Sequence, residues 1–472
     1  MSALSFGPAF PSAPEHRPMP NLGCLFDIPT GQYQTGKSGE SILNGGMAHI
    51  TGIGGRGNVG KSLVARFQNL TVLDRLSDSV SMLYDTEISA GMARTHQLAQ
   101  RFDNLGGVDL KRTGRFLLTA GDVMIGDKWY DEVRKYAENK QKAPDKEVKR
   151  TTPFLDDEGK QYKSYVPSNI EIDSLSQFTT SVVEDMQDKN TIGSSGRNME
   201  AIRGAGNKYQ MLNEFPTLTA SAGINMLLTA HVDDNITLDP YAPVIQKLAF
   251  LKSSLKFKRV PNNYFFLTNN LWYCYGTQPL RNPKLKTPEF PRDSYDDNPD
   301  STDLQEMTLQ NLRGKYGPTG SPFHLLVSQT QGVLRGLSEF YYCKSFEAST
   351  ADTFRFGLQG HDKSYRLALC PDVNLQRTTV RSKIDSTPEL QRGFEITSEL
   401  AQMRHVAYDQ YQELWCPPET LYADLVKQGY KWEDLLQTRG YWVFEEQKHP
   451  KHFLSTLDLL KMRAGTYKPY WM

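Results

Sequence analysis

The most specific spacing in this chain is a phosphate-binding pattern made by consecutive residues: Gly55, Arg56, Gly57, Asn58, Val59, Gly60, Lys61 and Ser62. It fits G-x-x-x-x-G-K-[ST], in which successive backbone N–H groups surround phosphate oxygens. In such a loop Lys61 reaches the outer phosphates of a nucleoside triphosphate, and the Ser62 hydroxyl ligates Mg²⁺. The pattern therefore predicts that ATP and Mg²⁺ bind here.

The segments on either side of this loop have the order that a phosphate site requires. Residues 47–53 are apolar enough for a buried strand, and residues 62–67 have the spacing of the first turns of a helix. The N-terminus of that helix would present its positive dipole end to the phosphates. A glycine-rich turn that matches by chance is the competing interpretation, and the flanking strand and helix count against it.

Triphosphate hydrolysis also needs a carboxylate near Mg²⁺, a group that orients water and a group that senses the γ-phosphate. Candidates follow three predicted strands, at the edge where open α/β sheets bind ligands. Glu87, with Asp85 as second choice, would orient the water. Asp173 would hold Mg²⁺, and His231 would contact the γ-phosphate. Solvated acids, a helix-capping aspartate and a structural histidine are the competing interpretations.

The bulk composition excludes several classes of protein. The 472 residues predict two or three domains, and 54 basic residues balance 54 acidic ones. The five cysteines form no CxxC pair, so neither a zinc site nor a disulfide framework is expected. The chain has neither a secretory signal nor an apolar run of about 18 residues that could span a membrane. These features predict a cytoplasmic protein without a membrane partner.

The chain divides into four parts by composition and pattern. Apolar strand-like runs alternate with helical stretches over the central part, which predicts an α/β core with a mostly parallel sheet. The Pro-, Ser- and Ala-rich start predicts a flexible arm, and the end of the chain predicts a small, mainly helical or winged domain. The predicted parts are an arm (1–37), the core (38–345), a connecting segment (346–384) and the C-terminal domain (385–472).

Several stretches of the core have a more local prediction. Residues 135–163 are dense in charge and residues 188–207 are rich in Gly, Ser and Asn, so both predict mobile surface loops. Residues 323–327 and 339–343 predict strands of an antiparallel extension of the sheet. Residues 264–267 predict another strand of the core.

Four motifs, taken in order, resemble those of the RecA recombinase family: residues 43–46, 84–87, 90–94 and 172–174. The resemblance covers residues 38–345 and implies a RecA-type P-loop NTPase core. It maps the catalytic glutamate of the family onto Glu87 and its Walker B aspartate onto Asp173. It also places His231 where the family has its γ-phosphate sensor.

Residues 312–320 look like the late hairpin of the related DnaB-type hexameric helicases. Basic residues of that hairpin enter the ATP site of the neighbouring subunit, so the resemblance implies this role for Lys315 and Arg313. The family usually has Arg where Lys315 stands, and Lys lacks the planar fork of Arg. The chain is similar to phage-encoded RecA-like proteins, which implies the host cytoplasm. The resemblance also implies self-association into a ring or filament.

Single-stranded DNA is the partner that the resemblance implies, bound by loops that follow the sensor strand. Residues 252–259 are basic and include Phe257, and residues 194–208 are basic and glycine-rich. Lys and Arg side chains can contact phosphates, and an aromatic ring can stack on a base. Solvated surface loops are the competing interpretation, because the net charge is zero.

These features together favour a DNA-dependent ATPase of the RecA fold that acts in recombination, repair or replication. Two alternatives stay open. One is a DnaB-type replicative helicase, which the late hairpin favours. The other is an ATP-switched assembly or binding protein that processes no DNA.

Overall fold

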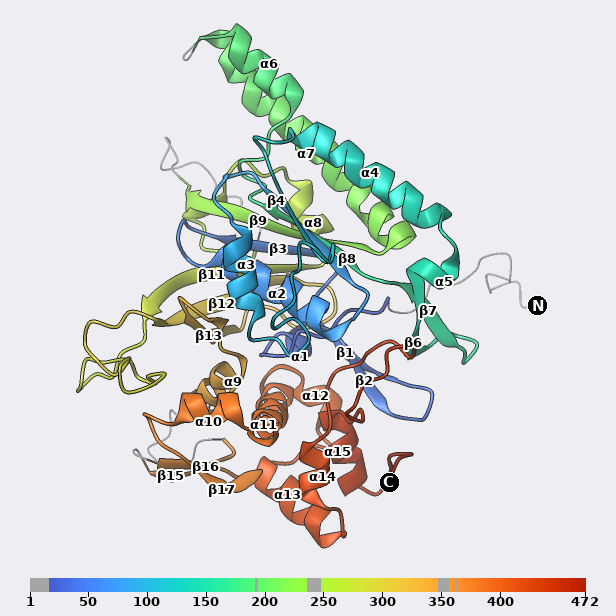
Figure 1. Ribbon diagram of the computed structural model, residues 1–472, viewed down its shortest axis with the longest axis vertical. Coiled ribbons are helices and arrows are strands. Elements are labelled where there is room, and N and C mark those ends of the chain that lie inside the picture. Colours follow the sequence, from blue (N-terminus) through green and yellow to red (C-terminus); the bar gives the residue numbers. More distant parts are fainter. Residues whose placement is uncertain (1–16, 192–193, 236–247, 347–355, 362–363) are drawn as a thin grey trace.

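A computed structural model describes residues 17–191, 194–235, 248–346, 356–361 and 364–472. Its centre is a sheet with the strand order β14-β13-β12-β11-β3-β9-β8-β4-β5, and β10 pairs with β9. The protein is therefore a mixed α/β protein with a large, mostly parallel central sheet, as the sequence predicts (Figure 1). The parallel strands are β3 (Ile50–Gly55), β4 (Val80–Asp85), β5 (Phe116–Ala120), β8 (Ser168–Asp173), β9 (Ile224–Asp234) and β11 (Asn270–Pro279).

Helices cover both faces of this sheet, because its strands present apolar side chains to both faces. In β9, Met226 and Leu228 join the core on one face, and Leu227 joins the core on the other. The first face packs against α4 (Gly126–Lys142), α7 (Ser195–Ala222) and α8 (Asn263–Leu267). The second packs against α2 (Lys61–Arg75), which also contacts α3 (Met92–Ala99).

The strand order places a topological switch point beside the phosphate loop. From β3 the chain passes through α2 to β4, on the side of β3 where β9 and β8 lie. From β9 it passes through β10 (Leu255–Phe257) and α8 to β11, on the opposite side of β3. Open α/β sheets bind ligands at the carboxyl ends of adjacent strands whose connections leave in opposite directions. Gly55, where the phosphate loop begins, pairs with His231 across β3 and β9.

The antiparallel extension predicted after the parallel strands is present, with one correction. It consists of β12 (Leu304–Gly314), β13 (Pro322–Ser328) and β14 (Gly332–Val333), so the predicted strand 323–327 is confirmed. Residues 339–343 are not a strand, since they lie in helix α9 (Arg335–Ser345). Leu337, Phe340 and Cys343 recur at helical spacing and are all buried. That period of three to four residues decides for a helix.

Residues 264–267 are also helical, in α8, although the sequence predicts a strand. Tyr264 is fully buried whereas Phe266 is half exposed, so the aromatic run does not form a two-sided strand. It crosses one face of the sheet as a single helical turn and a half.

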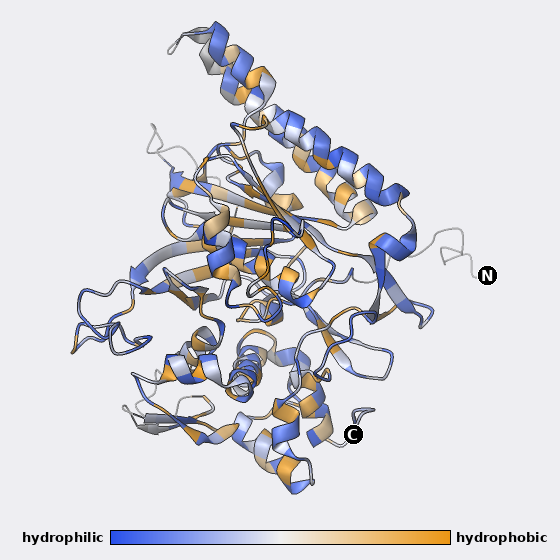
Figure 2. Ribbon diagram, viewed as in Figure 1, coloured by the Kyte–Doolittle hydropathy of each residue, from blue (hydrophilic) through white to orange (hydrophobic). Residues whose placement is uncertain are grey.

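Both predicted surface loops of the core contain regular structure. Residues 135–163 form the end of α4, the short α5 (Asp145–Val148) and a hairpin of β6 (Lys149–Leu155) and β7 (Gln161–Tyr165). Residues 188–207 form the end of α6 (Ser181–Lys189) and the start of α7, apart from residues outside the described chain. Val133 and Ala137 of α4 pack against α7, while hydrophilic residues line the outer side (Figure 2). The charges therefore mark an exposed helix face rather than a loop.

The predicted N-terminal arm is wrong over residues 17–37. This stretch holds α1 (Asp27–Thr30) and β1 (Gln32–Thr35), and β1 pairs with β2 (Ser41–Asn44). Phe26 is fully buried and makes edge-to-face contacts with Trp272 and Phe323, at ring-centroid distances of 5.2 and 5.6 Å. Such aromatic burial against the sheet fixes the segment.

The C-terminal part is mainly helical and continuous with the core. Its helices are α10 (Val380–Ser386), α11 (Pro388–Val406), α12 (Tyr408–Tyr411), α13 (Pro418–Lys427), α14 (Trp432–Leu436) and α15 (Thr456–Arg463). The predicted connecting segment is itself structured, since it carries β15 (Leu358–His361), β16 (Ser364–Leu367), β17 (Cys370–Leu375) and α10. Helix α11 packs against α9, and Phe394 contacts Phe340 at 5.6 Å between ring centroids.

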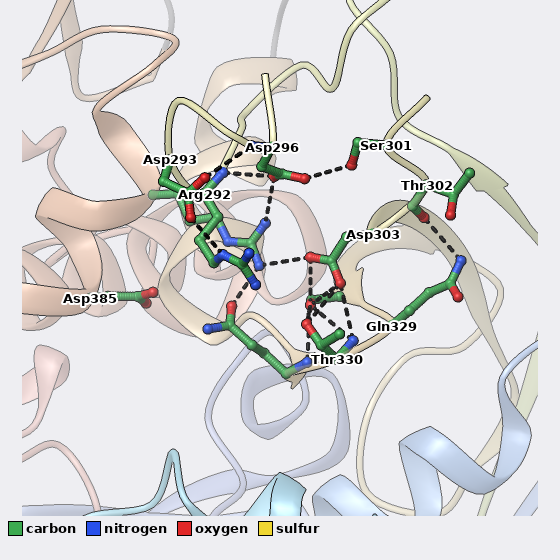
Figure 3. Close-up of polar contacts among 12 residues, drawn as sticks. Arg292, Asp293, Asp296, Ser301, Thr302, Asp303, Gln329, Thr330 and Asp385 are labelled. Carbon is green, nitrogen blue, oxygen red and sulfur yellow. Dashed lines mark hydrogen bonds and ion pairs between the residues drawn. The ribbon is translucent and has the colours of Figure 1, made fainter. Parts of the chain in front are cut away.

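A buried guanidinium joins this C-terminal part to the core. Arg381 of α10 is 1% exposed and donates to Asp303 at 3.1 Å and to Gln331. Asp303 also accepts hydrogen bonds from the Ser328 and Thr330 hydroxyls, which lie at the turn after β13 (Figure 3). The pKa of Asp303 is lowered because these hydrogen bonds and Arg381 outweigh its burial.

We expect Arg381→Met to lower the free energy of unfolding by about 3–5 kcal/mol, because it leaves buried carboxylates without their cation. Urea denaturation at neutral pH measures the change. Arg292→Gln is the matched control, since Arg292 pairs with Asp293 at the surface and such pairs contribute about 0–1 kcal/mol. Equal losses in the two variants would contradict the role of Arg381.

Candidate active site

The phosphate loop has a backbone shape that suits an anion. Strand β3 ends at Gly55 and α2 begins at Lys61, as the sequence predicts. Between them, Asn58 and Gly60 have positive φ angles of 59° and 83°. Backbones of this kind turn successive N–H groups toward one point and form an anion-binding concavity. The φ of 83° at Gly60 favours glycine, because residues with a side chain rarely adopt it.

Lys61 lies inside the loop rather than in solvent. It is 6% exposed, and its Nζ donates a hydrogen bond of 2.7 Å to the Arg56 carbonyl. Burial lowers the pKa of Lys61, while the nearby carboxylates of Asp173 and Glu87 act in the opposite direction. An ammonium group held this way can exchange a carbonyl partner for a phosphate oxygen. Ser62 is exposed at the first turn of α2.

Glu87 lies at the centre of a hydrogen-bonded cluster. Its Oε1 accepts from the Ser174 hydroxyl at 2.8 Å and lies 2.7 Å from Nε2 of His231. Burial alone would raise the pKa of Glu87, but the contacts with His231 and Ser174 and the charge of Lys61 lower it. Glu87 is therefore an ionised carboxylate that can accept a proton or a hydrogen bond from water.

Asp85, the second choice for the same role, is fully engaged by its own loop. Its Oδ1 accepts from the Glu87 N–H at 2.9 Å, and its Oδ2 accepts from the Ser89 and Ala90 N–H groups, both at 2.6 Å. A carboxylate with these backbone donors shapes the loop and has little capacity left for a water molecule. The structure thus separates the two acids: Asp85 positions the loop, and Glu87 contacts Ser174 and His231 beside Lys61.

Asp173 and His231 are held at the same edge of the sheet by strand register. Asp173 pairs with Asp85 across β8 and β4, and His231 pairs with Gly55 across β9 and β3. The Thr229 hydroxyl donates to Oδ1 of Asp173 at 2.5 Å. The structure therefore brings Lys61, Glu87, Asp173 and His231 together at the carboxyl ends of four strands.

The residues that would ligate Mg²⁺ are Ser62 and Asp173. Within the described part of the chain, no group of three or more His, Cys, Asp and Glu side chains could hold a metal ion. Mg²⁺ commonly binds to one or two protein oxygens, with waters and substrate phosphates completing its shell. A hydroxyl and a carboxylate beside the phosphate loop fit that requirement.

Lys315 and Arg313 lie at the other end of the sheet. Gly314 pairs with Asn270, and Asn270 pairs with Thr51 near the start of β3, whereas the phosphate loop follows its end. Arg313 Nε donates to the Thr268 carbonyl at 3.3 Å. These two basic residues therefore do not reach the phosphate loop of their own chain.

Comparison with known proteins adds little to this geometry. No protein-family model matches the sequence, and no curated protein matches it. Among solved structures, the chain is similar to one described as the crystal structure of the RadB recombinase, with 14% identity and a TM-score of 0.32. The match covers 62% of this chain and 93% of that one. At that TM-score the likeness supports no conclusion about fold or function, so the conclusions below depend on the geometry of the site.

Two of the residues predicted to contact DNA are buried. Phe257 is 8% exposed and packs over Gly54, so it is not available to stack on a base. Lys208 is also buried; its Nζ donates to the Leu175 carbonyl at 2.7 Å, and burial lowers its pKa to about 8. Residues 236–247, which follow β9 in the sequence, lie outside the described residues. Lys252 and Lys256 are exposed and stay candidates.

A buried ion pair that the sequence patterns do not reveal holds the elements of the site together. Glu171 of β8 is fully buried and receives Nε and Nη2 of Arg66 from α2, each at 3.3 Å. Arg66 Nη1 donates to the Thr95 hydroxyl of α3 at 2.6 Å. One guanidinium thus joins the phosphate-loop helix, the strand that ends at Asp173, and the helix after the Glu87 loop. A glutamate inside an apolar strand was the available signal.

We expect Arg66→Met to lower the free energy of unfolding by about 3–5 kcal/mol, because Glu171 is left buried without a cation. The loss should be smaller at pH 5 than at pH 8. Burial already raises the pKa of Glu171, and a folded state that binds a proton loses stability as pH rises. Urea denaturation at both pH values measures this.

The control is the double variant Arg66→Met/Glu171→Met, which removes both charges and keeps similar volume. It should recover most of the lost stability. A double variant that is no more stable than Arg66→Met at pH 8 would contradict the ion-pair interpretation.

Proposed function

We propose that this protein is a RecA-like, Mg²⁺-dependent ATPase that acts on DNA in recombination, repair or replication. One observation carries the proposal: Lys61, Glu87, Asp173 and His231 meet at the edge of the sheet where a loop with an anion-binding backbone follows β3. A phosphate site, an ionised carboxylate and a candidate metal ligand are the groups that triphosphate hydrolysis needs.

In this proposal the side chains divide the work of hydrolysis. The loop N–H groups and Lys61 hold the β- and γ-phosphates and stabilise charge as it moves toward the leaving group. Glu87 orients the attacking water and accepts a hydrogen bond from it. Mg²⁺, held through Ser62 and Asp173, would neutralise charge on the phosphate oxygens. His231 ties Glu87 to strand β9 through the 2.7 Å contact.

The proposal includes self-association, which the position of the basic hairpin supports. Lys315 and Arg313 are far from the phosphate loop of their own chain, so any role at an ATP site requires a neighbouring copy. A ring or a filament would supply that neighbour. Single-stranded DNA is the proposed partner, contacted by the exposed Lys252 and Lys256 after the sensor strand.

Two alternative functions are each supported by a feature of the structure. A DnaB-type helicase is supported by the hairpin between β12 and β13, whose tip carries Lys315. An ATP-switched assembly protein would use the same phosphate loop without processing DNA. The host cytoplasm is the proposed location, and within the described residues no helix is long and apolar enough to cross a bilayer.

We expect Lys61→Ala to lower ATP hydrolysis at least about 100-fold, because it removes the cation that contacts the transferring phosphate. Glu87→Gln should keep ATP affinity within about twofold but slow turnover by about 10²–10⁴, the usual contribution of a general base. Release of phosphate at saturating ATP and nucleotide titration measure the two effects. The control, Glu138→Gln, changes an exposed acid of α4. Wild-type turnover in Glu87→Gln would exclude Glu87 as the water-orienting group.

Single-stranded DNA should raise the ATPase rate several-fold, and Lys252→Ala/Lys256→Ala should abolish that increase without changing the basal rate. Lys142→Ala/Lys146→Ala is the matched control, because it removes two exposed cations from the α4–α5 region. Steady-state assays with and without DNA, alongside electron micrographs, make the comparison. Rings or filaments without any DNA effect would favour the ATP-switched assembly protein, and unwinding of a forked duplex would favour the helicase.

A further inference from the structure

A second polar cavity lies at the end of the sheet opposite the phosphate loop. Its volume is about 230 Å³. It lies beside His49, Gly223 and Asn225, at or next to the amino ends of β3 and β9. Four separate segments close it: residues 17–20, the β6–β7 hairpin, the end of α7, and residues near Trp442. None of the side chains proposed for ATP hydrolysis lines this cavity.

The charged residues that line this cavity are all basic. They are Arg17, Lys149 and Lys163, and no Asp or Glu is among the described lining residues. Lys149 is partly neutralised by Asp145 at 2.9 Å and lies 4.9 Å from the centre of the Tyr165 ring. Three cations without a lining carboxylate attract an anionic group, and this attraction is strong where water is partly excluded.

His49 adds a neutral side chain to the wall of this cavity. Its Nδ1 lies 3.0 Å from Oδ1 of Asn225, and Nδ2 of Asn225 donates to Asn169. Its Nε2 is buried and makes no hydrogen bond with the described residues. Burial lowers the pKa of His49, so the ring adds no charge to the three cations.

Aromatic rings form much of the remaining wall. Tyr162, Tyr165, Trp442 and Phe444 line the cavity. Trp442 is fixed by a hydrogen bond of 2.9 Å from its Nε1 to the Met19 carbonyl. Rings held in this way suit a planar ligand group better than a flexible chain.

We propose that this cavity binds a small organic anion that combines a planar ring with a phosphate or carboxylate group. Arg17, Lys149 and Lys163 hold the anionic group, and the aromatic side chains of the wall contact the planar ring. A nucleic-acid strand fits less well, because the cavity is small and residues 17–20 and Trp442 close part of it. The site is separate from the proposed ATPase chemistry and stands without it.

The test is isothermal titration calorimetry of the full chain carrying Lys61→Ala, which weakens phosphate binding at the ATP site. The probes are 4-hydroxyphenyl phosphate, 4-hydroxybenzoate and inorganic phosphate. We expect one ring-containing probe to bind at least about tenfold more tightly than inorganic phosphate, and the two ring probes distinguish phosphate from carboxylate. Adding Arg17→Gln/Lys163→Gln should weaken that binding at least about tenfold, since charge-assisted contacts are lost.

Two controls keep the test specific. Lys160→Gln removes an exposed cation from the turn of the same hairpin and should leave binding within about twofold. Arg17→Gln/Lys163→Gln in the otherwise native chain should leave ATP hydrolysis unchanged. Absence of binding by both ring probes, or equal loss in Lys160→Gln, would overturn the proposal. Loss of single-stranded DNA binding in the Arg17/Lys163 variant, without small-anion binding, would assign the cations to nucleic acid instead.

Discussion

The site depends on one buried contact, the ion pair between Arg66 and Glu171. Strand β8 must place Asp173 opposite the start of α2, and Glu171 lies two residues earlier on the same face of that strand. Arg66 lies about one turn beyond Lys61 on α2. The ion pair therefore fixes the separation of α2 and β8 close to the phosphate loop. Burial of the two charges lowers stability through desolvation. The pair fixes the position of the phosphate loop relative to the carboxylates.

Helix α3, which follows the loop that carries Glu87, is tied to the far end of the sheet. Arg94 of α3 donates to the carbonyls of Gln329 and Thr330 in the turn after β13. That same turn is held by Asp303, which Arg381 of α10 neutralises. A continuous set of polar contacts therefore runs from α3 to the C-terminal helices.

Much of this arrangement was accessible from the sequence because it depends on local patterns. The phosphate loop, the strand before it and the helix after it follow from residue type and period alone. Apolar runs locate the three strands, and their register places Asp173, His231 and the loop that carries Glu87 at one edge of the sheet. Arg66 was not found, because its function depends on a partner more than a hundred positions away.

The errors also have a physical pattern. The charge in residues 135–163 favours a loop, although α4 is charged mainly on its outer face and Val133 and Ala137 are buried. The basic context of Phe257 favours an exposed ring, although this ring packs over Gly54, where the absence of a side chain makes room for it. Short aromatic runs such as residues 264–267 have no period that distinguishes strand from helix.

The hydrogen bond between His231 and Glu87 has a thermodynamic consequence. His231 belongs to β9, and β9 pairs with β10, which carries Lys256. A change in the position of β9 therefore changes the environment of the carboxylate, and the reverse also holds. Free-energy coupling between two binding sites is reciprocal. If a nucleotide at the proposed site changes the affinity of β9 and β10 for a ligand, that ligand changes the affinity for the nucleotide by the same factor.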